Sequence, residues 1–132
     1  MGKEARRISS QHRQLDTFYE LIERALDEGR AADARAGAQR FGDALEAHFS
    51  LEDHFYFPAL HGLRPELDGE LGGLVDEHQS LLAEFRAAGA LLEASRLPAA
   101  REALEAFVAQ LTDHEEREEA LLARLEGGGR AT

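Results

Sequence analysis

One pattern of apolar and polar residues occurs twice in the chain, 66 residues apart. It reads F-x3-L-x2-H-x3-E, beginning at Phe41 in the first copy and at Phe107 in the second. Because an α-helix turns about 100° per residue, these spacings place all four side chains on one helical face. The two copies align without a gap, so the chain is predicted to consist of two similar halves.

Apolar residues at helical spacing predict two helices in the first half of the chain. The first helix has Ser9 and Ser10 as candidate N-terminal caps, and Gly29 is expected to end it. The second spans about 31–62, and Pro58 should kink or loosen its last turn.

The second half of the chain repeats this organisation. The third helix follows a loop, "GLRPELDG", and ends near Ser95, and Pro98 suits the first turn of the fourth helix. The residues expected to point inward are Ile8, His12, Leu15, Tyr19, Ile22 and Leu26, then Phe41, Leu45, His48, Glu52, Phe55 and Ala59, then Leu71, Val75, His78, Leu82 and Phe85, and last Phe107, Leu111, His114, Glu118, Leu121 and Leu125.

Four long helices with short connections predict an all-α fold, an antiparallel up-down-up-down four-helix bundle built from two similar helical hairpins. The 132 residues suit a single domain, 1–132, with a core at about 8–126 and a flexible tail at 127–132. A formal net charge of −11 argues against nucleic-acid binding and against an anionic membrane surface. No secretory or membrane-spanning segment is found, so we expect a cytoplasmic protein.

Six polar residues occupy positions where a bundle ordinarily buries apolar side chains. A lone inward histidine is usually a hydrogen-bonded core residue, but an unpaired buried carboxylate is costly. Four histidines, one per helix, and two glutamates at one level are explained together by a metal site. The predicted ligands are His12, His48, Glu52, His78, His114 and Glu118. His54 and His61 lie on the opposite side of their helix and should face solvent.

The donor set narrows the choice of metal. Structural zinc sites use four ligands, often with cysteine, and calcium and magnesium prefer oxygen throughout. Four histidines and two carboxylates exceed the needs of one zinc ion, and the chain has no cysteine. They suit two iron ions bridged by carboxylates inside a bundle, with manganese or zinc as alternatives. Whether one ion or two are bound is left open at this point.

The layout resembles the hemerythrin-like (HHE cation-binding) domain over residues 8 to 126. The matching segments are a histidine on the first helix, "HFSLED" on the second, "EHQSLL" on the third and "HEEREE" on the fourth. The resemblance implies a non-haem di-iron centre with an oxo or hydroxo bridge. It assigns His12 and His48 to one iron, His78 and His114 to the other, and Glu52 and Glu118 as bridges.

The chain departs from the family pattern at two positions. Oxygen-carrying members have a second histidine one turn after the histidine of the third helix, where this chain has Leu82. They usually end with a carboxylate five residues after the last histidine; that residue is Glu119, whereas the repeat favours Glu118. Asp16 is the nearest alternative donor in sequence for an open coordination position.

Two tyrosines belong to the expected surroundings of the centre. Tyr19 and Tyr56 could lie close to it, although aromatic core packing is the favoured explanation of each.

These observations leave four functions to compare. The first is a di-iron protein that binds or senses dioxygen or nitric oxide, with any protein partner unknown. The second is a di-iron enzyme with oxidase, peroxidase-like or nitric-oxide-directed activity, made more plausible by Leu82. The third is an iron homeostasis protein, and the fourth is a metal-free interaction bundle. We expect a metal- and oxygen-binding protein ahead of a dedicated enzyme.

Overall fold

The computed structural model describes the backbone of residues 3–129 and the side chains of residues 6–125, and this part of the chain contains helices and no strand. The elements are α1 (Lys3–Asp27), α2 (Ala31–Leu51), the π-helix η1 (Glu52–Tyr56), α3 (Phe57–Leu60), the 3-10 helix η2 (Pro65–Leu67), α4 (Asp68–Glu93) and α5 (Leu97–Gly129).

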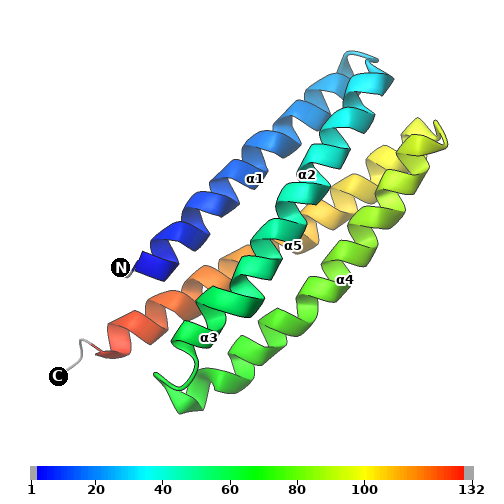
Figure 1. Cartoon of the computed structure of the whole chain (residues 1–132). Helices are drawn as coiled ribbons and strands as arrows, with labels where there is room; N and C mark the ends of the chain where they lie inside the picture. Colours follow the sequence, from blue (N-terminus) through cyan, green and yellow to red (C-terminus); the bar gives the residue numbers. More distant parts are fainter. Residues whose placement is uncertain (1–2, 130–132) are drawn as a thin grey trace.

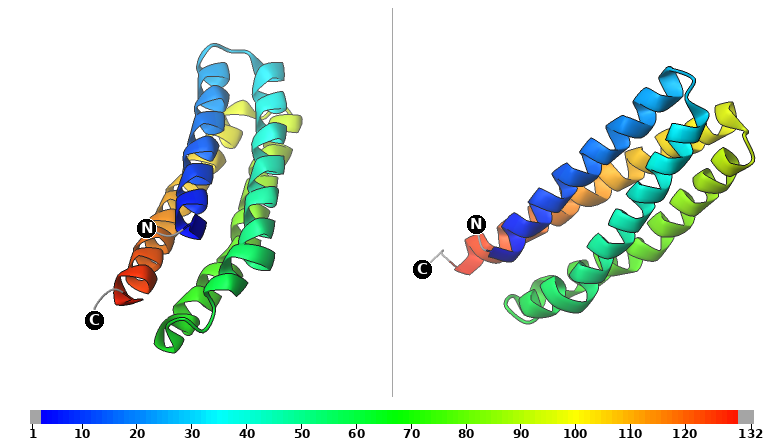
Figure 2. Two further views of the ribbon diagram at one scale, coloured as in Figure 1. Left: turned by 60° about the vertical axis from the view of Figure 1, so that its left-hand side comes forward. Right: turned by 45° about the horizontal axis from the view of Figure 1, so that its top comes forward.

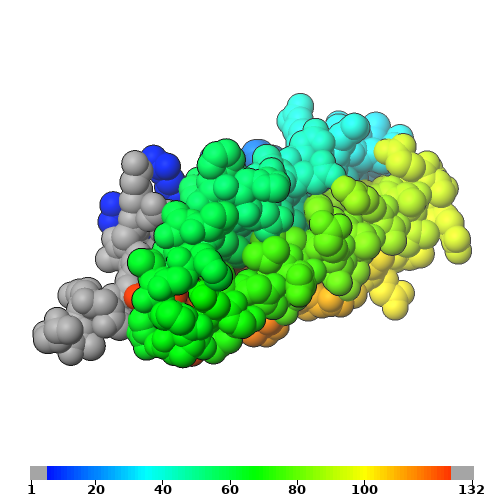
Figure 3. Space-filling model, turned by 60° about the horizontal axis from the view of Figure 1, so that its bottom comes forward, coloured from blue at the N-terminus to red at the C-terminus, as the bar shows by residue number. Residues whose placement is uncertain are grey.

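The long helices form two antiparallel hairpins that pack side by side. α1 pairs with α2, and α4 pairs with α5 (Figure 1). α2 also lies along α4, and α1 lies along α5, which closes the bundle (Figure 2). Figure 3 shows the face on which α2 and α4 are neighbours. The predicted antiparallel four-helix bundle of two hairpins is therefore confirmed.

Two apolar clusters fill the bundle, one on each side of a polar layer. The cluster nearer the hairpin turns includes Phe41, Phe85 and Phe107, whose ring centroids lie 5.0–6.0 Å apart. The other cluster lies nearer the start of α4 and includes Ile8 and Leu121. Burial of these side chains supplies the main driving force for assembly of the bundle.

The two hairpins turn in the same way. In the first, Gly29 has a φ of +71° and the Arg30 N–H donates to the Ala25 carbonyl at 2.8 Å. In the second, Ser95 has a φ of +59° and the N–H of the next residue donates to the Leu91 carbonyl at 2.9 Å. Gly29 ends α1 as predicted, by a C-terminal motif that needs a left-handed residue. The repeat therefore extends to the turns.

A π-helix changes which side of the second helix faces the core. In η1 the Phe57 N–H donates to the Glu52 carbonyl five residues earlier, which widens the turn. Pro58 has no N–H and its ring would collide with the carbonyl four residues back in a regular α-helix, so the wide turn accommodates it. The predicted loosening near Pro58 is confirmed.

The extra residue in that turn makes two predicted core positions wrong. Phe55 is 65% exposed and Ala59 is exposed as well. Tyr56 and Leu60 take the buried positions, together with Phe57. The corresponding part of α5 is regular helix, so Leu121 and Leu125 are buried there as predicted.

Other local predictions are also corrected. α1 begins by Lys3, so Ser9 and Ser10 lie inside the helix and are not caps. At three positions along α1 and α4 the buried side chain is one that was not predicted to point inward, namely Ala25, Leu74 and Leu81. The predicted inward residues beside them are only partly buried, and these are Leu26, Val75 and Leu82. The apolar stripes are thus broader than one line of residues.

The end of α5 and the location of the protein remain predictions. α5 runs to Gly129, and residues 130–132 lie outside the described residues, so the flexible tail expected at 127–132 is an untested prediction. Within the described residues, every helix is too short or too polar to cross a membrane. The cytoplasmic location likewise stays a prediction.

Candidate metal centre

All six predicted ligands meet in the polar layer between the two apolar clusters. Each is buried, and both glutamates are 0% exposed. Their ligand atoms form two groups, and within each group all of these atoms lie within 4.8 Å of one another. The first group is His12, His48, Glu52 and Glu118, and the second is His78, His114, Glu52 and Glu118. The two glutamates belong to both groups.

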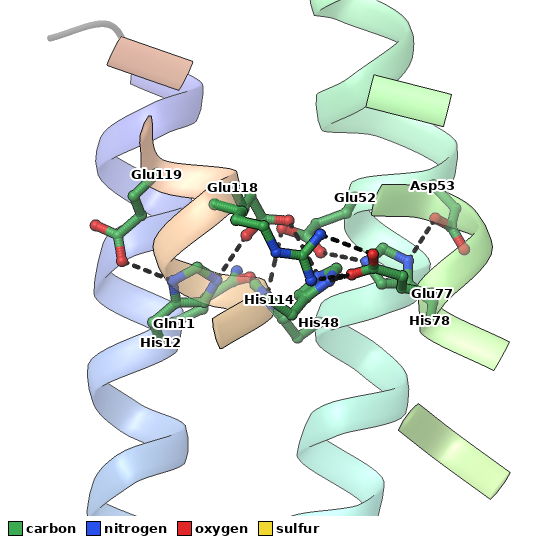
Figure 4. Close-up of polar contacts among 11 residues, drawn as sticks. Gln11, His12, His48, Glu52, Asp53, Glu77, His78, His114, Glu118 and Glu119 are labelled. Carbon is green, nitrogen blue, oxygen red and sulfur yellow. Dashed lines mark hydrogen bonds and ion pairs between the residues drawn. The ribbon is translucent and has the colours of Figure 1, made fainter. Parts of the chain in front are cut away.

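Each glutamate turns one oxygen toward each group. Glu52 Oε2 lies 3.4 Å from His48 Nε2, while its Oε1 lies 3.1 Å from His78 Nε2. Glu118 Oε1 lies 2.7 Å from His12 Nε2, while its Oε2 lies 3.7 Å from His114 Nε2. Figure 4 shows the two carboxylates between the imidazoles. This is the arrangement that two carboxylates need to bridge two ions.

These inward atoms are buried and form no well-aligned hydrogen bond, although some of them lie at ion-pair distance from one another. They include Nε2 of His12, His78 and His114 and all four carboxylate oxygens of Glu52 and Glu118. Buried polar atoms nearly always have hydrogen-bond partners. This many unpartnered atoms in one place therefore indicate that the layer binds a ligand. An ion bonded to nitrogen and oxygen at about 2.0–2.2 Å leaves its donors at most about 4.4 Å apart. Small side-chain movements would therefore let each group share one cation.

The electrostatics of the layer also favour a cation. Burial, followed by the negative charge of Glu118, raises the pKa of the Glu52 carboxyl. Burial also lowers the pKa of His12, but its close contact with Glu118 outweighs that effect and raises the pKa to about 9. Burial beside His12 lowers the pKa of His48 to about 3. Without a metal, the facing carboxylates rely on protons to offset their repulsion, and a bound cation would replace those protons.

The outward nitrogen of each histidine is held by a polar side chain. His48 Nδ1 contacts Gln11 Oε1 at 2.5 Å, and His12 Nδ1 contacts Glu119 Oε2 at 3.0 Å. In the other half, His78 Nδ1 contacts Asp53 at 2.9 Å and His114 Nδ1 contacts Glu77 at 2.7 Å. An Nδ1–H donated to these oxygens leaves the Nε2 lone pair facing the cluster, as a metal ligand requires.

These four orienting residues were missed by the sequence reasoning, which considered Glu119 only as a bridge. The sequence does contain a signal for these four residues. Each is adjacent to a predicted metal ligand, and their positions also follow the repeat of 66 residues. Gln11 corresponds to Glu77, and Asp53 corresponds to Glu119. The polar contacts are thus repeated along with the donors.

The structure separates Glu118 from Glu119. Glu118 is fully buried and faces the cluster, whereas the Glu119 side chain is 42% exposed and accepts a hydrogen bond from Ser9 Oγ at 2.7 Å. Leu82 lies outside the cluster, in a groove between α2 and α4. Asp16 is exposed and is absent from both groups of ligand atoms.

The tyrosines and the remaining histidines take different places. The Tyr56 hydroxyl accepts a hydrogen bond from Gln11 Nε2 at 3.3 Å, so it reaches the centre only through Gln11 and His48. Tyr19 packs edge-on against Phe41 in the core. His54 and His61 are exposed, as predicted.

One pair of equivalent positions breaks the symmetry of the centre. Phe49 stacks on the His78 ring, with centroids 3.9 Å apart. The residue 66 positions later is Glu115, which is 8% exposed and whose Oε2 lacks a hydrogen-bond partner. Burial, and then the charges of Asp16 and Glu118 against that of His12, raise the pKa of the Glu115 carboxyl to about 8. The His12 side of the centre therefore has an additional buried carboxyl.

The fold and this donor set define a helical-bundle protein with a buried cation-binding site. The sequence model of the hemerythrin HHE cation binding domain matches residues 4–125. The chain therefore belongs to the hemerythrin HHE cation-binding domain family. Neither a curated protein nor a solved structure matches the chain in the corresponding comparisons.

Proposed function

We propose that the protein holds two non-haem iron ions and binds or senses a small diatomic ligand, dioxygen or nitric oxide. His12 and His48 would hold one ion, and His78 and His114 the other. Glu52 and Glu118 would bridge them. The observation that carries the proposal is the burial of seven orphaned donor atoms of these residues within one layer of the bundle.

The balance of donors supports iron over the alternatives. Each ion would receive two imidazole nitrogens and two bridging oxygens, with no thiolate. Imidazole with carboxylate suits iron and manganese, and a six-coordinate ion would keep positions free for water or an added ligand. A bound pair of reduced irons would supply electrons to the diatomic ligand. The chain supplies fixed imidazoles and an apolar enclosure, in which Phe49 and Phe57 flank His78.

Metal content and absorption spectra test this proposal together. The protein would be reconstituted with ferrous iron without oxygen and then exposed to air or to nitric oxide. We expect about two irons per chain and new near-ultraviolet bands of a bridged ferric pair after oxidation. Retention of zinc in preference to iron would contradict the iron assignment, and failure to bind any metal would contradict the proposed centre.

An enzyme is the second candidate, because Leu82 contributes no donor and each ion would have only four protein donors. Open positions permit turnover of dioxygen or peroxide as well as reversible binding. Sustained peroxide-dependent oxidation of a dye, lost in His78→Ala, would favour the enzyme. A stable oxygenated form without peroxide consumption would favour the binding protein.

A further inference from the structure

The four seams between neighbouring helices differ in charge beside the buried centre. A groove of about 230 Å³ lies between α1 and α5, and its rim carries Asp16, Glu20 and Glu23. None of the described residues that line it is a lysine or an arginine. Its floor includes Leu111, one turn before Glu115 and His114 on α5.

The other three seams suit a cation less well. Along α4–α5 the grooves are lined by Arg117 and Arg124, and the Arg117 guanidinium makes two hydrogen bonds of 2.8 Å to Glu77. The α2–α4 groove carries Arg35 and Arg86 beside its acidic residues Asp43, Glu46 and Glu93, so its negative charge is partly offset. The α1–α2 groove is lined by amides, apolar residues and His48, without an acidic residue.

Glu115 lies on α5 between the residues of the acidic groove and Glu118 of the centre. Its carboxyl is more than nine-tenths buried, and its Oε2 has no hydrogen-bond partner. On α5 it lies one turn after Leu111 of the groove and next to His114, and on α1 Asp16 of the groove lies one turn after His12. Neither group of ligand atoms includes Glu115, so its carboxyl lies beside the bridged pair and not within it.

We propose that divalent cations reach the centre through the α1–α5 groove, and that the Glu115 carboxylate binds each cation last before it passes to His12. This inference rests on the proposed metal-binding function. The rim carboxylates raise the local concentration of cations, and negative charge at the mouth of a cleft can speed association by 10-fold or more. Phe49 at the equivalent position of the other half leaves that side without such a group.

Stopped-flow absorption with Co²⁺ tests this route on the full-length metal-free protein, and transfer of Co²⁺ to a chelator gives the release rate. In Glu115→Gln we expect uptake and release both to slow about 10-fold, with two Co²⁺ still bound and the Kd changed less than about twofold. Glu115→Asp keeps a carboxylate and should stay within about threefold of the unmodified rate. Removal of a buried carboxylate should not unfold the chain, and circular dichroism checks this.

A double variant tests the rim. Asp16→Asn with Glu20→Gln should slow uptake several-fold and weaken its dependence on salt. Asp43→Asn is the matched control, because it removes the same charge type from the α2–α4 groove. Its uptake rate should not change.

Three outcomes would overturn the proposed route. Unchanged uptake in both Glu115→Gln and the double variant would mean that cations use another seam. Weaker equilibrium binding in Glu115→Gln, with uptake unchanged, would make Glu115 a ligand of the centre and not a step on the route. If the unmodified protein bound no Co²⁺, the proposed metal centre would fail together with the route.

Discussion

Each histidine of the centre is held at its outward ring nitrogen, while its inward nitrogen faces the buried carboxylates. This arrangement gives neighbouring acidic residues different roles. Glu118 faces the Nε2 atoms, and Glu119, the next residue, holds Nδ1 of His12 from outside. The two carboxylates are one residue apart but lie on different sides of the same ring. Substitution of these two residues should therefore have different effects on metal binding.

Glu118→Gln and Glu119→Gln separate these roles. We expect Glu118→Gln to lower the bound metal from two ions per chain to one or none, because the bridge is lost. Glu119→Gln should still bind two ions at saturation, with affinity weaker by about 10- to 100-fold. Metal titration followed by elemental analysis measures both quantities, and the reverse ranking would mean that Glu119 is the bridge.

Asp53 offers a test of orientation with a close control. Asp53→Ala removes the partner of His78 Nδ1, and we expect metal affinity to fall about 10- to 100-fold while helix content stays constant. Asp43→Ala removes an exposed aspartate ten residues earlier and should leave affinity within about twofold. Equal losses in the two variants would point to net charge and not to the His78 contact.

The donors could be predicted from the sequence, and their partners could not. Inward periodicity and the cost of burying six polar side chains single out His48 and Glu52 and their equivalents. Gln11 and Asp53 lie at the edge of a helical face, where periodicity alone gives an acidic or amide side chain a solvated role. Their contacts depend on the rotation of each helix in the packed bundle, which spacing along one helix does not specify.

At the level of elements, the two hairpins share a turn that only one of them builds with glycine. Gly29 and Ser95 occupy equivalent positions with left-handed backbone. This conformation costs an L-residue roughly 1–2 kcal/mol, whereas glycine adopts it freely.

Ser95→Gly should therefore stabilise the protein. We expect a gain of about 0.5–1 kcal/mol in the free energy of unfolding, because relief of the left-handed strain exceeds the added flexibility of the unfolded chain. Gly29→Ser is the reciprocal variant and should lose a similar amount. Chemical denaturation of the metal-free protein measures both, and a destabilised Ser95→Gly would refute this account of the turn.

The helices themselves were predictable to within a few residues, and the π-helix was the main exception. Pro58 indicated a disturbed turn, but several local rearrangements relieve the same collision. The wide turn of the π-helix places Tyr56 on the buried side and Phe55 on the exposed side. The repeat was misleading at this point, because α5 has no proline in the equivalent turn.

For the whole molecule, the polar layer destabilises the packing of the two hairpins without a metal, and a bound metal is expected to stabilise it. Glu52 lies in η1 of the first hairpin and Glu118 in α5 of the second, so a cation held by both carboxylates would join the two hairpins. Without a cation, the same two buried carboxylates oppose the packing of the hairpins.

Thermal unfolding should show both effects. Metal at about 100 times its Kd should stabilise the protein by about 2.7 kcal/mol per site, raising the Tm. The double variant Glu52→Gln with Glu118→Gln should lose this metal-dependent gain, while its metal-free form is as stable as the unmodified protein or more so. Calorimetry with and without a chelator measures the difference, and a gain that survived in the double variant would place the metal elsewhere.

Each of the two shared glutamates faces histidines from both hairpins, and this has a consequence for the ancestry of the chain. Each hairpin supplies both histidines of one group of ligand atoms, but only one of the two carboxylates that the groups share. A half-length chain with the pattern of either hairpin would therefore lack a complete centre alone and would gain one when two copies met face to face. Duplication and fusion of such a chain would convert an association dependent on concentration into a permanent one, and equivalent positions such as Phe49 and Glu115 could then diverge.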